Sequence, residues 1–230
     1  MLPTSNVVEE VIFGDQGLIW SMDPNSLIID MSTASYIKSM EISERLADQG
    51  HRFVDAPVGR SKREAKTGDL LVMAGGDADD IEQASDIFEA VGNTIIHAGP
   101  IGYGLKSKLV NNYMAMVNNA VTGETLSFAN QVGLDIEATA KLMSSTAAGL
   151  GQLNTNYPKK VLANDLTPDF PISMVVKDLN MVLELADSFK GKCLFGEVAK
   201  KMFQEAEVDG MGHLDQTAIL KHLLGGKSKT

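Results

Sequence analysis

Short segments rich in β-branched residues alternate with helical patterns over the first hundred residues, and this alternation limits the fold more than any other feature. The segments with strand character are residues 26–32, 52–58, 69–75 and 93–98. Strands that alternate with helices are typical of a sheet whose strands run parallel and whose helices cover its faces. The sequence therefore predicts an α/β domain with a parallel sheet in the N-terminal part of the chain.

Two crossover helices are expected between these strands. Residues 36–49 carry apolar side chains at helical spacing and stop before Gly50, a residue type that commonly ends helices. A second apolar stripe begins after Asp77, which occupies a typical N-cap position, and stops before Gly92. Each helix would connect two strands as a βαβ unit.

The pattern becomes entirely helical after Gly99. One long helix is predicted over residues 105–132, and shorter ones over residues 136–143, 172–188, 195–208 and 215–224. We therefore expect two domains, an α/β domain in residues 1–101 and an all-helical domain in residues 102–230 that begins with the long helix.

Composition excludes several classes of protein. The formal net charge of −10 opposes the phosphate contacts that non-specific nucleic-acid binding needs. No apolar run approaches the roughly 20 residues of a membrane span, and the N-terminus lacks the features of a secretory signal peptide. Cys193 is the only cysteine, so an internal disulfide is impossible, and no metal-ligand spacing surrounds it. We expect a cytoplasmic protein with no nucleic-acid, membrane or metal partner.

The start of the chain lacks a feature that nucleotide-binding sheets usually carry. Such a sheet opens with a strand, a G-x-G-x-x-G turn and a helix whose N-terminus holds the pyrophosphate. This chain opens with Met-Leu-Pro at residues 1–3, and a short helix capped by Thr4 or Ser5 is predicted up to Gly14. A domain that starts inside its sheet leaves an edge uncovered. We therefore expect about 60 further residues upstream, including the residue that selects NAD or NADP.

Lys108 and Asn112 are the first candidates for chemistry. They lie four residues apart on the predicted long helix, so their side chains share one face just after the domain boundary, where clefts commonly form. A lysine in such a place can protonate a carbonyl oxygen as a hydride arrives, and the asparagine amide can hold the same oxygen. From spacing alone, a solvated lysine is the commoner interpretation.

Residues 102–112 have the pattern G-x-G-x-x-x-K-x-x-N-N, which resembles the signature of the β-hydroxyacid dehydrogenases of the 3-hydroxyisobutyrate dehydrogenase type. Other motifs of this family occur in its order: D-x-S-T at residues 30–33, D-A-P-V at 55–58, T-G-D-L at 67–70 and K-D-L at 177–179. The resemblance implies an NAD(P)-dependent oxidoreductase that acts on CH–OH groups. It also implies that residues 1–101 are the C-terminal part of a Rossmann domain and that residues 102–230 are a helical substrate and dimerisation domain.

The resemblance further implies roles for individual residues. Lys108 is the implied catalytic acid and base, and Asn112 is implied to orient the reacting group. The implied substrate-binding residues are Gly59, Arg60, Ser61 and Asn111, and the implied NAD or NADP contacts are Leu2, Pro3, Thr33, Phe170 and Lys177. Taken one at a time, the cofactor residues also fit structural roles in the core, at a helix cap or on a solvated helix face.

The implied substrate loop departs from the common family pattern. The usual Ser-Gly-Gly after D-A-P-V is replaced by Gly59-Arg60-Ser61, and a guanidinium can hold an anion through two hydrogen bonds. This triplet and T-A-A-G at residues 146–149 resemble the sulfolactaldehyde reductases, whereas Ala115 stands where that subgroup is expected to have a small hydroxyl side chain. The expected reaction is therefore reduction of 3-sulfolactaldehyde to 2,3-dihydroxypropane-1-sulfonate. Tartronate semialdehyde and 3-hydroxyisobutyrate are the carboxylate alternatives.

A function of a different class stays open. Without the glycine-rich turn the pyrophosphate loses its helix N-terminus, so the chain is also compatible with a truncated, non-enzymatic interaction protein. The presence of Lys108, Asn112, Arg60 and Lys177 favours the enzyme. The family resemblance implies a homodimer or homotetramer.

Overall fold

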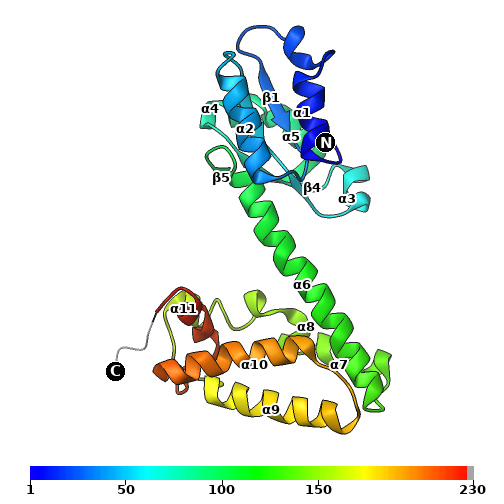
Figure 1. Ribbon diagram of the computed structural model, residues 1–230, viewed down its shortest axis with the longest axis vertical. Helices are drawn as coiled ribbons and strands as arrows, with labels where there is room; N and C mark the ends of the chain where they lie inside the picture. The colour runs from blue at the N-terminus through cyan, green and yellow to red at the C-terminus, as the bar shows by residue number, and fades with distance from the viewer. Residues whose placement is uncertain (227–230) are drawn as a thin grey trace. The chain divides into compact units, whose positions relative to one another are not determined.

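The computed structural model describes residues 1–226 (Figure 1). The chain divides into two compact units, Met1–Met116 and Val117–Thr230. The first unit contains a sheet and its helices, and the second unit is helical. The predicted fold class, an α/β domain followed by a helical part that begins with a long helix, is confirmed. None of the described helices has the length and apolar character needed to cross a membrane.

The sheet of the first unit is mixed rather than wholly parallel. Its strands are β1 (Leu27–Asp30), β2 (Arg52–Asp55), β3 (Val58–Gly59), β4 (Leu70–Gly75) and β5 (Gly92–Gly99). β1 pairs with β2 in parallel and β4 pairs with β5 in parallel, as the sequence predicted. β2 and β3, in contrast, run antiparallel to β4. The segment between β3 and β4 is shorter than the dozen or more residues that a parallel crossover needs, which explains the antiparallel pairing.

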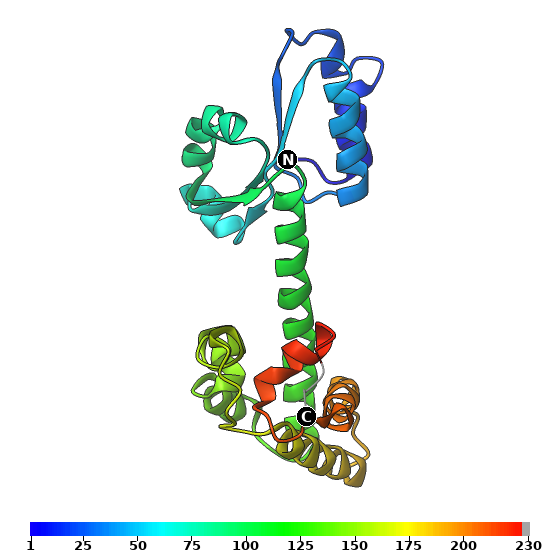
Figure 2. The same cartoon turned by 90° about the vertical axis from the view of Figure 1, so that its left-hand side faces the viewer.

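Helices cover both faces of this sheet (Figure 2). They are α1 (Ser5–Phe13), α2 (Tyr36–Ala47), α3 (Lys62–Thr67), α4 (Ala78–Gln83) and α5 (Ser85–Val91), with a 3-10 turn, η1 (Leu18–Trp20), after α1. α1 and α2 pack around Phe53 on one face, and α4 and α5 pack around Val54 on the other. Because successive strand residues point to opposite faces, β2 contributes to both cores.

Two local predictions for the first unit were wrong. Residues 52–58, predicted as one strand, form β2 and β3 with a break between them, and the helix α3 that follows was not predicted. α3 begins with a capping box in which the Ser61 side chain accepts from the backbone at Arg63 while Glu64 accepts from the Ser61 N–H. The helix predicted after Asp77 is divided at Ala84 into α4 and α5, and the Asp77 side chain makes no capping hydrogen bond.

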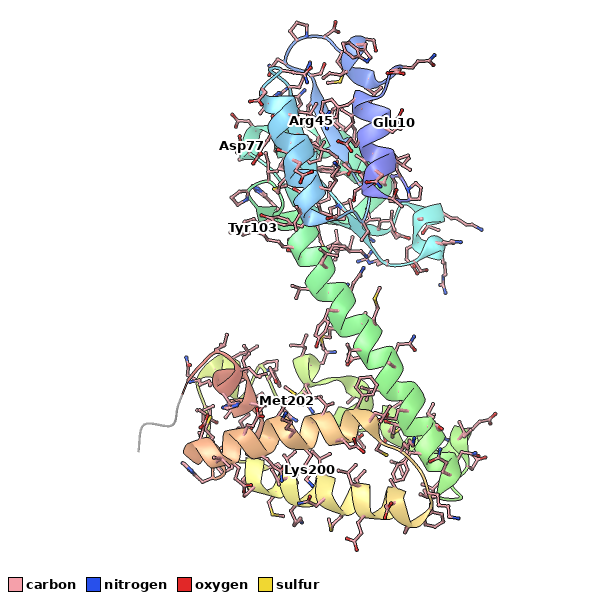
Figure 3. The ribbon with its side chains drawn as sticks, viewed as in Figure 1. Glu10, Arg45, Asp77, Tyr103, Lys200 and Met202 are labelled. Carbon is pink, nitrogen blue, oxygen red and sulfur yellow. The ribbon has the colours of Figure 1, made fainter. Side chains whose placement is uncertain are left out.

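The predicted long helix is α6 (Tyr103–Gln131), and it begins two residues earlier than expected. Its 29 residues correspond to about 43 Å at the usual rise per residue. The helix starts in the first unit, where Figure 3 labels Tyr103 in its first turn, and it ends in the second unit. Tyr103, Lys108 and Asn112 all belong to the first unit.

Helices α9 and α10 lie side by side in the second unit (Figure 1). Its helices are α7 (Ile136–Ser144), α8 (Ala147–Leu150), α9 (Ile172–Ser188), α10 (Leu194–Ala206) and α11 (Ile219–Leu223), with 3-10 turns η2 (Gln152–Asn154), η3 (Val161–Ala163) and η5 (Gln216–Ala218). The helix predicted up to residue 208 ends in a π turn, η4 (Glu207–Met211), because Gly210 adopts a φ of +85°. Apart from an isolated bridge between Pro171 and Asp215, the described residues of this unit contain no β-structure.

Phe88 and Ile87 form a matched pair for testing the core of the first unit, because Phe88 is completely buried and Ile87 is 51% exposed. We expect Phe88→Ala to lower the free energy of unfolding by about 3–5 kcal/mol and Ile87→Ala by less than about 1 kcal/mol. Urea denaturation followed by the fluorescence of Trp20, the only tryptophan and a residue of the same unit, measures both changes. Equal losses from the two substitutions would contradict this packing.

Candidate functional site

The last residues of four strands lie in one row across the sheet of the first unit. Asp30 pairs with Asp55, Asp55 pairs with Gly75, and Gly75 pairs with Gly99. The pair β1 and β2 reaches this row from one direction, and the pair β4 and β5 reaches it from the other. In open α/β sheets ligands bind outside the carboxyl ends of the strands. The row therefore marks the candidate site.

Two hydrogen bonds hold the opening loop of the chain at the β1 end of the row. The Asp30 carboxylate accepts from the Ser32 N–H at 2.9 Å, and the Ser32 hydroxyl oxygen accepts from the Leu2 N–H at 2.8 Å. Ser32 is buried, whereas the adjoining Thr33 and Pro3 are exposed and Leu2 is half-buried. The structure thus brings the predicted cofactor residues Leu2, Pro3 and Thr33 together beside the row.

Asp55 ties the start of helix α6 to the centre of the row. One carboxylate oxygen accepts from the Gly102 N–H at 2.6 Å, and the other accepts from the Leu105 N–H at 2.7 Å. Burial raises the pKa of Asp55 to about 6, against the opposing effect of these hydrogen bonds, and the nearby Asp30 charge contributes to the rise. At neutral pH the carboxylate is therefore ionised while it holds the helix.

Glycines allow the backbones to approach Asp55 closely. A Cβ atom on Gly75 would lie 2.6 Å from a carboxylate oxygen of Asp55, and one on Gly104 would lie 2.6 Å from its carbonyl oxygen. Gly102 has a φ of +87°, a conformation that glycine adopts easily, and a Cβ there would lie 2.6 Å from the Tyr36 ring. The G-x-G part of the family signature is thus required by the packing of α6 against the strands.

Lys108 and Asn112 lie on the first turns of α6 that follow this anchor. Both side chains are half-buried, and Asn111 is exposed. Burial lowers the pKa of Lys108 from its ordinary value of 10.5. Among residues 1–226 no carboxylate forms an ion pair with Lys108. The arrangement provides a lysine that exchanges its proton more readily near neutrality than a solvated lysine does.

Arg60 lies away from the row of strand ends. Its guanidinium donates to the Asp69 carbonyl oxygen, to Asn93 Oδ1 at 2.6 Å and to Thr94 Oγ1 at 3.0 Å. These groups are at the amino ends of β4 and β5, and five residues of strand, about 16 Å, separate Thr94 from Gly99. The structure therefore does not place this guanidinium beside Leu2 and Thr33.

The neighbours of Arg60 also take part in local structure. Gly59 is buried in β3 and pairs with Leu71. The Ser61 N–H donates to Glu64 Oε2 at 3.0 Å, and the Ser61 hydroxyl contacts the same oxygen. The hydrogen bonds with Ser61 lower the pKa of Glu64. Both donors of Ser61 are thus used by the capping box, and a substrate would have to displace Glu64 to reach them.

Phe170 and Lys177 belong to the second unit. Phe170 is half-buried just before α9, and Asp215 Oδ2 accepts from its N–H at 3.4 Å while Gln216 donates to its carbonyl oxygen at 2.8 Å. Burial alone would raise the pKa of Asp215, but hydrogen bonds from Thr217, Asp169 and Phe170 outweigh burial and lower it. Lys177 is exposed on α9 and pairs with Asp178 at 3.0 Å.

The residues that position the candidate site were not identified from the sequence. Ser32, Asp55 and Asp215 act through hydrogen bonds to residues 30, 47 and 46 positions away in the chain. Ser32 and Asp55 stand in the D-x-S-T and D-A-P-V motifs, but the motifs do not indicate these remote partners, and Asp215 had only its place before a helix as a signal. The S-x-x-E pattern at Ser61 was a recognisable capping box and should have predicted α3.

We also searched residues 1–226 for side chains that could bind a metal ion. Within residues 1–226 no group of three or more His, Cys, Asp or Glu side chains is placed to hold a metal ion.

Comparison with known proteins gives matches along almost the entire chain. Residues 1–99 match the NAD-binding domain of 6-phosphogluconate dehydrogenase, and residues 102–223 match the family described as NAD-binding of NADP-dependent 3-hydroxyisobutyrate dehydrogenase. The 3-sulfolactaldehyde reductase of Escherichia coli (strain K12) is 36% identical over 223 residues, which cover 97% of this chain and 75% of that protein. The NAD-dependent L-serine dehydrogenase of Pseudomonas aeruginosa is 30% identical, covering 96% of this chain and 76% of that protein.

A solved structure supports the same assignment. The 3-hydroxyisobutyrate dehydrogenase of Mycobacterium tuberculosis is 25% identical, with a TM-score of 0.60, and the match covers 97% of this chain and 77% of that one. The family matches together span both units. The chain therefore belongs to the NAD(P)-dependent β-hydroxyacid dehydrogenases of the 3-hydroxyisobutyrate dehydrogenase type, the family that its motifs predicted.

Proposed function

We propose that this protein reduces 3-sulfolactaldehyde to 2,3-dihydroxypropane-1-sulfonate with NADH or NADPH. The observation that carries the proposal is Arg60, whose guanidinium is bound only by uncharged oxygens among the described residues. Within residues 1–226 no carboxylate forms an ion pair with this guanidinium, and Glu64, whose pKa the Arg60 charge helps to lower, does not accept a hydrogen bond from it. The similarity to the 3-sulfolactaldehyde reductase of Escherichia coli supports the same substrate.

Lys108 is the proposed proton donor in this reduction. The dinucleotide, when bound, supplies the hydride to the aldehyde carbon. Lys108 gives its ammonium proton to the aldehyde oxygen, so that no bare alkoxide forms, and it takes the proton back in the reverse reaction. Its lowered pKa supports both roles, because a catalytic acid or base works best when its pKa is not far from the working pH. Asn112, one turn further along α6, is proposed to orient the same oxygen.

Residues 1–101 are proposed to hold the dinucleotide. The donor set beside the row of strand ends fits such a group, because the exposed Thr33 hydroxyl suits a ribose or amide, and the half-buried Leu2 and the exposed Pro3 offer apolar contact. The assignment of Phe170 and Lys177 to the dinucleotide rests on the family resemblance. Residues 102–230 are proposed to be the helical substrate and dimerisation domain.

Arg60 is proposed to bind the anionic end of the substrate, with Gly59, Ser61 and Asn111 as further contacts. Hydrogen bonds to an ionised acceptor are roughly twice as strong as those between neutral groups. The Arg60 side chain is therefore proposed to leave the neutral acceptors Asn93 and Thr94, at the amino ends of β4 and β5, and to turn toward the sulfonate when the substrate binds. The carboxylate substrates tartronate semialdehyde and 3-hydroxyisobutyrate are the second candidates, and Ala115 favours them because it lacks the hydroxyl expected in the sulfolactaldehyde reductases.

A homodimer or homotetramer is also proposed. α6 exposes large apolar side chains in its middle turns, with Val110 71%, Tyr113 72% and Met116 67% accessible. A contiguous apolar helix face on a folded protein usually contacts a partner. A second copy of this chain is the proposed partner.

Replacement of Lys108 tests the mechanism. We expect Lys108→Met to lower kcat about 100- to 10,000-fold in both directions. In the wild type, kcat for alcohol oxidation should rise with pH as Lys108 loses its proton, and kcat for aldehyde reduction should fall over the same range, with a midpoint below 10.5. Lys106→Met, on the same helix but exposed, is the control and should keep both profiles. A Lys108→Met enzyme with a wild-type kcat would rule out this role.

Replacement of Arg60 tests the substrate assignment. We expect Arg60→Ala to lower kcat/KM for 3-sulfolactaldehyde about 10- to 100-fold, the loss of one or two charge-assisted hydrogen bonds. The uncharged analogue glyceraldehyde should be reduced equally by both enzymes, so the ratio of the two substrates separates anion binding from any loss of stability. Arg63→Ala, which removes a charge from the exposed side of α3, is the control. If the wild type prefers tartronate semialdehyde, the sulfonate assignment is wrong.

A further inference from the structure

The Asp55 carboxylate lies between the end of β2 and the start of α6, although 47 residues separate it from Gly102 in the chain. The residue is 1% exposed, and each of its carboxylate oxygens accepts one N–H of the helix start. Neither the resemblance nor the proposed mechanism gives this group a role. It is the only side chain shown to bind the backbone N–H groups of α6 at its first turn among the described residues.

A carboxylate is chemically suited to this position. The first N–H groups of a helix lack partners within the helix, and the positive end of the helix dipole favours a negative charge. The distances of 2.6 and 2.7 Å to Gly102 and Leu105 are those of charge-assisted hydrogen bonds. An asparagine amide has only one accepting oxygen, so it could satisfy one of these N–H groups and would point its own N–H at the other.

Close packing prevents single residues of the helix start from adjusting locally to a different side chain at position 55. A Cβ on Gly75 would lie 2.7 Å from the Gly104 nitrogen, so the strand and the helix are already in contact beside Asp55. Leu105, which donates to the carboxylate, is itself 1% exposed. A lost hydrogen bond at Asp55 must therefore be compensated by movement of the helix start as a whole.

Such a movement would displace the proposed proton donor. Lys108 follows Leu105 by three residues, about 4.5 Å along the helix axis, and so lies within one turn of the anchor. A displacement of about 1 Å at a catalytic group can lower a rate about 100-fold. The opening loop of the chain, which carries Leu2, is held separately, through its hydrogen bond to Ser32 and the hydrogen bond between Ser32 and Asp30.

We propose that Asp55 is a positioning residue, which fixes the first turn of α6 and thereby sets the place of the Lys108 amine relative to the row of strand ends. The inference rests on the proposed role of Lys108. Asp55 itself does not touch the substrate. Its loss should therefore affect the chemical step and leave dinucleotide binding largely intact.

The test compares Asp55→Asn with Asp80→Asn in the purified gene product. Asp80 is also a buried carboxylate of the first unit, but it pairs with Arg52 away from α6. We expect Asp55→Asn to lower kcat about 10- to 100-fold. The KM for the dinucleotide should stay within about threefold of the wild-type value. Amide hydrogen exchange in residues 102–108 should become at least about tenfold faster than in the wild type. Asp80→Asn should lower stability while kcat and the exchange of residues 102–108 stay at wild-type values.

The outcomes separate this inference from the proposed role of Lys108. An Asp55→Asn enzyme with wild-type kcat, beside an inactive Lys108→Met enzyme, would overturn the role of Asp55 and leave that of Lys108 intact. If Lys108→Met is active, the role of Lys108 fails, and unchanged exchange in Asp55→Asn would show separately that Asp55 does not hold the helix. Equal changes in kcat and in dinucleotide KM would indicate a general structural role and would also overturn the inference.

A measurement on the wild type covers the case in which Asp55→Asn does not fold. The amide proton shifts of Gly102 and Leu105, followed by NMR from pH 4 to pH 8, should titrate together with a midpoint near the Asp55 pKa of about 6. Asp30 is the neighbouring charged group that acts on Asp55, and the Ser32 amide, which donates to Asp30 and not to Asp55, is the comparison signal. Amides of Gly102 and Leu105 that do not titrate would overturn the inference.

Discussion

The two hydrogen bonds from the start of α6 to Asp55 determine where the long helix leaves the sheet. They exist because β2 and β4 meet end to end, so that the last residue of one strand lies beside the last residue of the other. Glycine at positions 75 and 104 is what allows the helix backbone to come this close. The G-x-G signature of the family and the end-to-end meeting of β2 and β4 thus both bring the start of α6 to one buried carboxylate.

Neighbouring carboxylates in the row hold different parts of the candidate site. Asp30 holds Ser32 and, through it, the Leu2 loop, whereas Asp55 holds the helix that carries Lys108. The two strand ends are paired in register, so the two negative charges are close, and the charge of Asp30 contributes to the raised pKa of Asp55. Two buried charges side by side disfavour the ionised state. The arrangement therefore fixes the geometry of the site at some expense in stability.

The sequence predicted the elements whose signal is local and failed where the determining contact is remote. α2, α6 and α9 follow from apolar spacing within each segment, and their predicted bounds agree with the structure to within a few residues. The antiparallel meeting of β2 with β4 follows from the break between β2 and β3 and the short connection to β4, and the strand pattern of residues 52–58 did not reveal that break. The hydrogen bonds of Asp55 join residues 47 and 50 positions apart, so spacing within a motif does not reveal them. The roles of Lys108 and Arg60 came from the family resemblance and remain proposals.

If Arg60 binds the anionic end of the substrate as proposed, the substrate must displace the groups that hold the guanidinium in this structure. The left-handed backbone at Arg60, with a φ of +73°, directs a guanidinium whose acceptors in this structure are a carbonyl oxygen, an amide oxygen and a hydroxyl. A neutral substrate gains nothing by replacing them, because one set of neutral hydrogen bonds is exchanged for another. An anion gains the difference between neutral and charge-assisted hydrogen bonds, roughly 1 kcal/mol for each bond replaced. Under the proposed role of Arg60, selectivity for an anionic tail therefore arises from the difference between the neutral acceptors that hold the guanidinium and the charge-assisted hydrogen bonds that replace them.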